Sequence, residues 1–186
     1  HFVLRVELPG MSLDELQALC PNLEEIAVVV TWFGDDLRAG ACKIRPAVID
    51  NEATDFSEPW KVCGVERIDA TKVSMVDGAT AYGGTPSDQS VIECIAEIRS
   101  RGLRVALYPF LMMDIPADNA LPSPYGGDAQ PPFPRRGRIT CMPGPHQEDS
   151  ADKSAAARSQ VDAFCGSASV SDFSVEEDEI VFAGDS

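Results

Sequence analysis

Residues 25–32 read Glu-Ile-Ala-Val-Val-Val-Thr-Trp, a β-branched and continuously apolar run. This pattern is typical of a strand that is buried on both faces in a parallel sheet. Residues 103–108, Leu-Arg-Val-Ala-Leu-Tyr, form a second run of the same kind, which Pro109 is expected to close. The sequence therefore predicts two buried, parallel strands.

A helix is expected before each strand. Residues 12–15, Ser-Leu-Asp-Glu, form a capping box that opens a short helix. Before the second strand, Thr85 is expected as the N-cap and Pro86 as the first helical residue, with Gly102 just beyond the helix end. A helix, a tight turn and an apolar strand thus follow one another twice, which is the order of parallel βα units.

These units predict an α/β fold, a (β/α) TIM barrel of which the chain supplies the N-terminal portion only. A complete barrel takes about 250 residues, whereas this chain has 186. We expect residues 1–10 to be an entry segment or linker and residues 11–186 to belong to the incomplete barrel. Residues 37–80 have no assigned topology.

A long loop rich in proline and glycine is expected at residues 115–147. It leaves the C-terminal end of a strand, where barrel enzymes build their sites. Structureless loops of this length are usually functional or mobile. Ser150 is then expected to cap a helix over about residues 151–165, which Gly166 ends.

Composition excludes several classes of protein. The formal net charge of −15 argues against nucleic acid and anionic membranes as partners, since both repel acidic proteins. No apolar stretch is long enough for a membrane span. Six cysteines occur without any C-x-x-C pair, so we expect reduced, structural thiols and no metal. No phosphate loop or dinucleotide fingerprint is present, and no cofactor is expected.

Candidate catalytic residues follow the two strands. Asp35 and Asp36 end the first, and Asp114 follows the second, so all three should lie at one rim of a parallel sheet. Beside Trp32, such carboxylates resemble a carbohydrate site, because glycoside hydrolysis uses two carboxyl groups. The alternative is that the aspartates cap helices or turns and that Trp32 belongs to the core.

Three residues are candidates for substrate binding. Trp32 and Tyr108 could supply aromatic faces for a sugar, and Arg45 could clamp a carboxylate. The alternative for Arg45 is an ordinary surface arginine. The two histidines, His1 and His146, lie apart from these residues in the sequence, so the general base of a hydrolytic triad is not expected among them.

Four stretches resemble the TIM-barrel-like domain of gene transfer agent and phage tail baseplate proteins. Two of them contain unusual motifs, Trp-Phe-Gly-Asp-Asp at 32–36 and Tyr-Pro-Phe-Leu-Met-Met-Asp at 108–114. The four stretches are residues 19–37, 81–88, 101–114 and 135–140.

The resemblance implies a glycoside-hydrolase-like barrel in a structural component of a virion-like particle, at the tail tip, made in the bacterial cytoplasm. Its partners would be other baseplate proteins, the rest of its own chain and a host surface glycan, in a ring-type homo-oligomer. The family's barrel continues with strands beyond this chain, one of which carries a glutamate suited to acid–base catalysis. Three functions therefore stay open: a structural baseplate component, an active glycoside hydrolase, and a non-catalytic carbohydrate-binding module.

Overall fold

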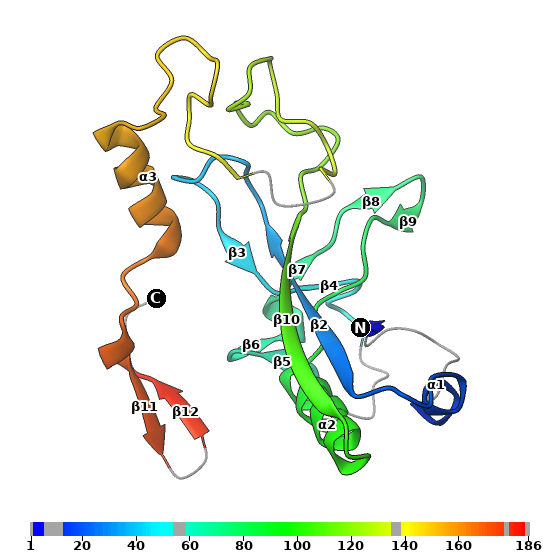
Figure 1. Cartoon of the computed structure of the whole chain (residues 1–186). Coiled ribbons are helices and arrows are strands. Elements are labelled where there is room, and N and C mark those ends of the chain that lie inside the picture. The colour runs from blue at the N-terminus through cyan, green and yellow to red at the C-terminus, as the bar shows by residue number, and fades with distance from the viewer. Residues whose placement is uncertain (1, 6–12, 54–58, 135–138, 177–178, 185–186) are drawn as a thin grey trace.

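The centre of the molecule is a parallel sheet in the order β1-β2-β10 (Figure 1). The computed structural model describes residues 2–5, 13–53, 59–134, 139–176 and 179–184. The three strands are β1 (Phe2–Arg5), β2 (Glu25–Gly34) and β10 (Arg104–Met113). β2 and β10 pair in parallel along their whole length, from Glu25 opposite Arg104 to Gly34 opposite Met113. The two apolar runs thus form neighbouring parallel strands, which confirms this part of the sequence prediction.

Two helices cover one face of the sheet. They are α1 (Leu13–Leu19) and α2 (Asp88–Ser100). Ile26 and Val28 of β2 are buried against Leu16 of α1 and Ile98 of α2, and Leu103 completes this cluster. The even-numbered side chains of β2 therefore face the helices, because side chains alternate along a strand.

The start of α2 differs from the prediction. The N-cap is Ser87, whose hydroxyl accepts a hydrogen bond from the Ser90 N–H at 3.1 Å. Thr85 is instead buried, and its Oγ1 accepts a hydrogen bond from the Ala47 N–H at 3.0 Å. The sequence pattern could not distinguish these roles, because a threonine hydroxyl serves equally well for a helix cap and for a distant backbone group.

The end of α2 agrees with the prediction. Gly102 has a φ of 75°, the left-handed conformation that glycine adopts at helix ends. Its N–H donates to the Arg99 carbonyl, and the Leu103 N–H donates to the Ile98 carbonyl. These two bonds form a Schellman motif, and the accompanying contact between Leu103 and Ile98 joins the helix end to the core.

Replacing Gly102 by alanine is expected to lower the free energy of unfolding by about 1 kcal/mol, because a Cβ disfavours positive φ. No neighbouring atom would clash with that Cβ, so the loss comes from backbone conformation alone. Urea denaturation measures the loss. Asn tolerates the left-handed region, so Gly102→Asn should lose less than Gly102→Ala. Equal losses in the two variants would contradict this explanation.

Pro109 does not close β10, contrary to expectation, and the hydrogen-bond register gives the reason. The Arg104 N–H donates to the Glu24 carbonyl, and the Asp114 N–H donates to the Gly34 carbonyl. The even-numbered residues of β10 therefore donate toward β2, and the N–H groups of odd-numbered residues point to the free edge. Proline at position 109 removes a donor that the ladder does not use, as is usual for edge strands.

Short strands fill the chain between β2 and α2. β3 (Ile44–Arg45) pairs antiparallel with the end of β2. The others form three two-stranded sheets: β4 (Ala47–Val48) with β7 (Thr71–Lys72), β5 (Lys61–Val62) with β6 (Val65–Glu66), and β8 (Met75–Val76) with β9 (Ala79–Thr80). Val48, Trp60, Val62 and Ala70 form their core, with Trp32 packed against it.

The C-terminal third begins with the long loop. Residues 115–134 and 139–147 form no helix or extended ladder, as the composition predicts. The helix α3 (Ala155–Cys165) is capped by Ser154, not by Ser150, and ends at Gly166. An antiparallel hairpin of β11 (Phe173–Glu176) and β12 (Glu179–Phe182) follows. Among the described residues, no helix is both long and apolar enough to cross a membrane.

The predicted TIM barrel is wrong. Within the described ranges, only three strands run parallel in one open sheet, and the remaining strands form small separate sheets or short antiparallel additions. The βα order predicted correctly which strands are parallel. It could not predict closure, because barrels and open sheets use the same local βα unit and differ in the order, tilt and stagger of the strands.

Candidate functional site

Asp36 lies at the end of β2 and is buried, at 4% exposure. Its carboxylate accepts hydrogen bonds from the Arg38 guanidinium, at 2.6 Å from Nη2 to Oδ2 and 3.0 Å from Nε to Oδ1. The Arg38 N–H and the Gln130 amide also donate to Oδ1, at 2.8 and 2.7 Å. The carboxylate thus accepts hydrogen bonds from four donors of the protein itself.

These contacts set the charge of the pair. Burial raises the pKa of Asp36, but hydrogen bonds from Arg38 and Gln130 outweigh it, so the pKa lies below its ordinary value. Hydrogen bonding to Asp36 in turn raises the pKa of Arg38. Asp36 is therefore held ionised, which suits an ion pair and is the opposite of what a general acid needs.

The same network anchors the long loop. Gln130 is buried at 2% exposure, and its Oε1 accepts a hydrogen bond from the Leu37 N–H at 2.8 Å. Its amide nitrogen donates to Asp36 and to the Pro122 carbonyl. Nearby, Ile115 is buried with Leu37 and Met113. The loop is thus fastened to the end of the sheet by polar and apolar contacts together.

The other two candidate carboxylates also bind backbone groups. Asp114 Oδ2 accepts a hydrogen bond from the Ser74 N–H at 2.9 Å, and its buried Oδ1 accepts none from the described residues. Asp35, which is exposed, accepts one from the Lys43 N–H at 2.8 Å. Because Gly34 lies opposite Met113, all three carboxylates come to one rim of the sheet, as expected. Each one, however, holds a different segment in place.

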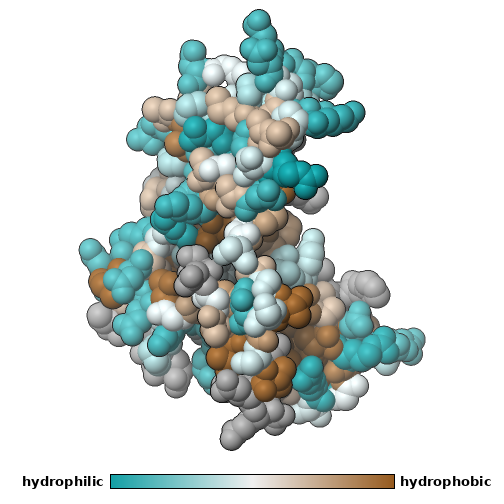
Figure 2. Space-filling model, turned by 90° about the vertical axis from the view of Figure 1, so that its left-hand side faces the viewer, coloured by the Kyte–Doolittle hydropathy of each residue, from teal (hydrophilic) through white to brown (hydrophobic). Residues whose placement is uncertain are grey.

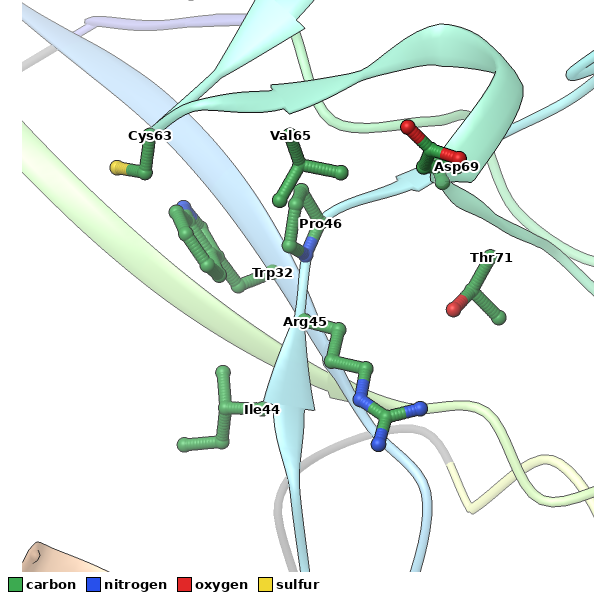
Figure 3. Close-up of a pocket in the computed structure, with 9 residues that line it drawn as sticks. Trp32, Ile44, Arg45, Pro46, Cys63, Val65, Asp69 and Thr71 are labelled. Atoms are coloured by element: carbon green, nitrogen blue, oxygen red, sulfur yellow. The ribbon is translucent and has the colours of Figure 1, made fainter. Parts of the chain in front are cut away.

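A pocket lies beside Trp32, where β3 pairs with the end of β2 (Figure 3). Its volume is about 400 Å³, and its lining includes Trp32, Ile44, Arg45, Pro46, Asp69 and Thr71. β2 supplies the indole, and β3 supplies Ile44 and Arg45. The 3-10 helix at Arg67–Asp69 supplies Asp69, and β7 supplies Thr71. The antiparallel pairing of β3 with β2 sets Ile44 opposite Gly34 and Arg45 opposite Phe33. Ile44 therefore shares the face of Trp32, and Arg45 lines the pocket from the other face of β3.

Tyr108 lies elsewhere. It pairs with Val29 in the sheet, so its side chain belongs to the face opposite that of the even-numbered residues of β2, including Trp32. There it is exposed and makes an edge-on contact with Phe110, with ring centroids 5.9 Å apart. The structure therefore brings together Trp32 and Arg45, but not Tyr108.

Sequence reasoning missed Asp69 and Thr71. They lie in residues 37–80, whose strands are only two residues long and carry no periodic signal. Their placement depends on the parallel pairing of β4 with β7, which joins positions more than twenty residues apart. Nothing in the local sequence could have indicated that pairing.

The described residues contain no group of histidine, cysteine and acidic side chains suited to a metal ion. All six cysteines are free thiols. Cys20 and Cys94 pack against the helix-side core, whereas Cys165 at the end of α3 is exposed. Burial raises the pKa of Cys94, which disfavours the reactive thiolate. The arginines at 135, 136 and 138 lie outside the described residues.

The geometry thus offers a rim of carboxylates bound to the backbone and to arginine, and a separate small pocket with an aromatic wall and a cation. No protein-family model matches the chain, and a search of curated proteins finds no significant match.

Proposed function

We propose that the chain is a non-catalytic, structural component of a phage-like tail baseplate, located at the tail tip of the particle. The observation that supports the non-catalytic role is the use of the three rim carboxylates. Asp36 is ionised and saturated by Arg38 and Gln130, and Asp114 and Asp35 accept backbone N–H groups. Glycoside hydrolysis needs two carboxyl groups that act together on one bond, whereas each rim carboxylate is bonded to a different segment of the chain.

The baseplate assignment rests on the resemblance of residues 19–37, 81–88, 101–114 and 135–140 to proteins of that kind. The exposed apolar side chains suit a component that is covered by neighbours in an assembly, including further copies in a ring. They include Leu107 and Tyr108 on β10 and Val170, Phe173 and Val175 before and within the C-terminal hairpin. Figure 2 shows apolar patches among hydrophilic surface on one side of the molecule.

An epitope-tagged protein tests this role in particles purified from the producing bacterium. Gold-labelled antibody is expected at the tail tip, and a tagged cytoplasmic enzyme serves as the control. Particles that lack the tagged protein would exclude the baseplate role.

The same particles test for catalysis. Asp114→Asn removes the charge but keeps an oxygen that can accept the Ser74 N–H, so the fold should be retained. Release of reducing ends from envelope polysaccharide is expected to be the same for this variant and for wild type. A hundredfold loss in the variant, the usual order for removing a catalytic group, would show that Asp114 is catalytic.

A second function is favoured by the pocket beside Trp32: binding of a host surface glycan without hydrolysis. An indole next to polar side chains is what a sugar requires, since one sugar face is apolar and its hydroxyls need hydrogen-bond partners. The pocket contains both kinds of group, and the candidate carboxylates at the rim are not part of its lining.

A further inference from the structure

The pocket beside Trp32 has an apolar half and a polar half. In Figure 3, Trp32 and Ile44 lie on one side of Pro46, and Arg45, Asp69 and Thr71 lie on the other. Ile44 and Arg45 fall on opposite sides because successive side chains of β3 alternate. A ligand that spans the pocket would therefore meet an aromatic face at one end and charged or hydroxyl groups at the other.

Arg45 is exposed and uncommitted. Its guanidinium makes no ion pair or hydrogen bond with any residue in the described part of the chain. Arg38 and Arg101, by contrast, are both paired with carboxylates. In a chain with a net charge of −15, Arg45 is thus a cation in the pocket lining that no described carboxylate neutralises. A guanidinium binds a planar carboxylate through two parallel hydrogen bonds.

Asp69 limits which anion fits. A phosphate dianion would bring two negative charges toward Asp69 with one arginine to balance them, whereas a carboxylate brings a single charge that Arg45 can neutralise. Asp69 and Thr71 can then accept hydrogen bonds from sugar hydroxyls. We propose that the pocket selects a sugar bearing a carboxylate, such as a uronic acid residue of an envelope polysaccharide; this inference rests on the proposed glycan-binding function.

One wall of the pocket is held before any ligand arrives. Arg67, two residues before Asp69, donates to the Asp50 carbonyl at 3.1 Å and lies 5.8 Å from the ring centre of Trp60. The Trp60 indole N–H donates to the Thr85 carbonyl at 2.7 Å. Lys72, just after Thr71, pairs with Asp50 at 3.2 Å. These contacts hold the segment that carries Asp69 and Thr71, so this side of the pocket needs little ordering on binding, whereas the Arg45 side chain would have to be ordered.

The size of the pocket limits the length of the ligand. About 400 Å³ is near the lower end of the range of small-molecule sites, which is about 300–1,000 Å³. One or two sugar rings fit such a volume, and a longer polysaccharide would have to extend into solvent. The binding unit is therefore short, and the acidic group has to lie within it to reach Arg45.

Calorimetric titration of the purified chain with galacturonosyl-galactose, which carries one carboxylate, and with its neutral counterpart galactobiose tests the inference. Wild type is expected to bind galacturonosyl-galactose about tenfold more tightly than galactobiose, the effect of one charge-assisted contact. Arg45→Gln should reduce this preference to within about twofold, and Arg45→Lys should retain part of it. Arg104→Gln removes an exposed arginine on another strand and is expected to leave the preference unchanged.

Trp32→Phe keeps an aromatic wall and reduces its area, so it should weaken both sugars equally without altering the preference. Thermal melts of all variants check folding. Equal binding of the two sugars by wild type would overturn the acidic preference and leave glycan binding in place. If wild type binds neither sugar, both the acidic preference and the glycan-binding function are overturned. Displacement of galacturonosyl-galactose by an equal concentration of inorganic phosphate would overturn the choice of a carboxylate.

Discussion

Replacing Gln130 by leucine is expected to lower the free energy of unfolding by about 3 kcal/mol, since it removes several partners of buried polar groups. The Leu37 N–H would lose its acceptor, and the Asp36 carboxylate would lose one donor. The Pro122 carbonyl would also lose a donor. Leucine has a similar size, so the effect comes from hydrogen bonding more than from packing.

Urea denaturation at pH 7 measures this loss. The same substitution at Gln89 is the matched control, because Gln89 lies on the exposed side of α2 and its amide donates only to Glu93. Gln89→Leu is expected to change the stability by no more than about 0.5 kcal/mol. Equal effects at the two positions would mean that the loop is not fastened by Gln130.

Replacing Gln130 by leucine should also loosen the loop. Because Gln130 connects residues 122 and 130 to the end of β2, the variant should expose the loop to proteases before the rest of the chain unfolds. Limited proteolysis is expected to cleave within residues 115–134 in the variant and not in wild type. Cleavage elsewhere, with this segment intact, would contradict the proposed anchoring.

The sequence was sufficient to predict the parallel strands and insufficient to predict how the sheet continues. The runs at 25–32 and 103–108 are apolar over many consecutive residues, a signal strong enough to identify two neighbouring parallel strands. Pro109 seemed a natural end for the second run. Its compatibility with β10 depends on which side of the strand each N–H faces, and this register is a property of the pair of strands rather than of either run.

The candidate site was predictable in part for the same reason. Asp35, Asp36 and Asp114 were expected at one rim because parallel strands end together, and they are found there. Their partners could not be predicted: Gln130 is more than ninety residues from Asp36, and Ser74 is forty residues from Asp114. Since a carboxylate at a strand end can be catalytic or structural, the distant partners decide its role.

Replacing Asp36 by asparagine is expected to lower the free energy of unfolding at pH 7 by about 3 kcal/mol, the usual effect of removing one member of a largely buried ion pair. Asparagine keeps one accepting oxygen, but its NH₂ group would face the donors of Arg38 or of Gln130. The Arg38 charge would also lose its partner. Asp35→Asn is the control: Asp35 is exposed and accepts one backbone N–H, so its replacement should lose less than about 1 kcal/mol.

The pH dependence of this difference tests whether Asp36 is held ionised. The pKa of Asp36 is lowered in the folded protein, whereas an aspartate in the unfolded chain has a pKa of about 3.9. The carboxylate therefore stabilises the fold fully above the unfolded value, and this contribution is lost as the pH falls through the lower, folded value. Asparagine does not titrate, so the stability gap between wild type and Asp36→Asn should be constant from pH 7 to pH 5. Below about pH 4 it should narrow. Denaturation curves of both proteins across this range measure the gap, and a gap that stays constant down to pH 2 would show that the ion pair does not stabilise the fold through its charge.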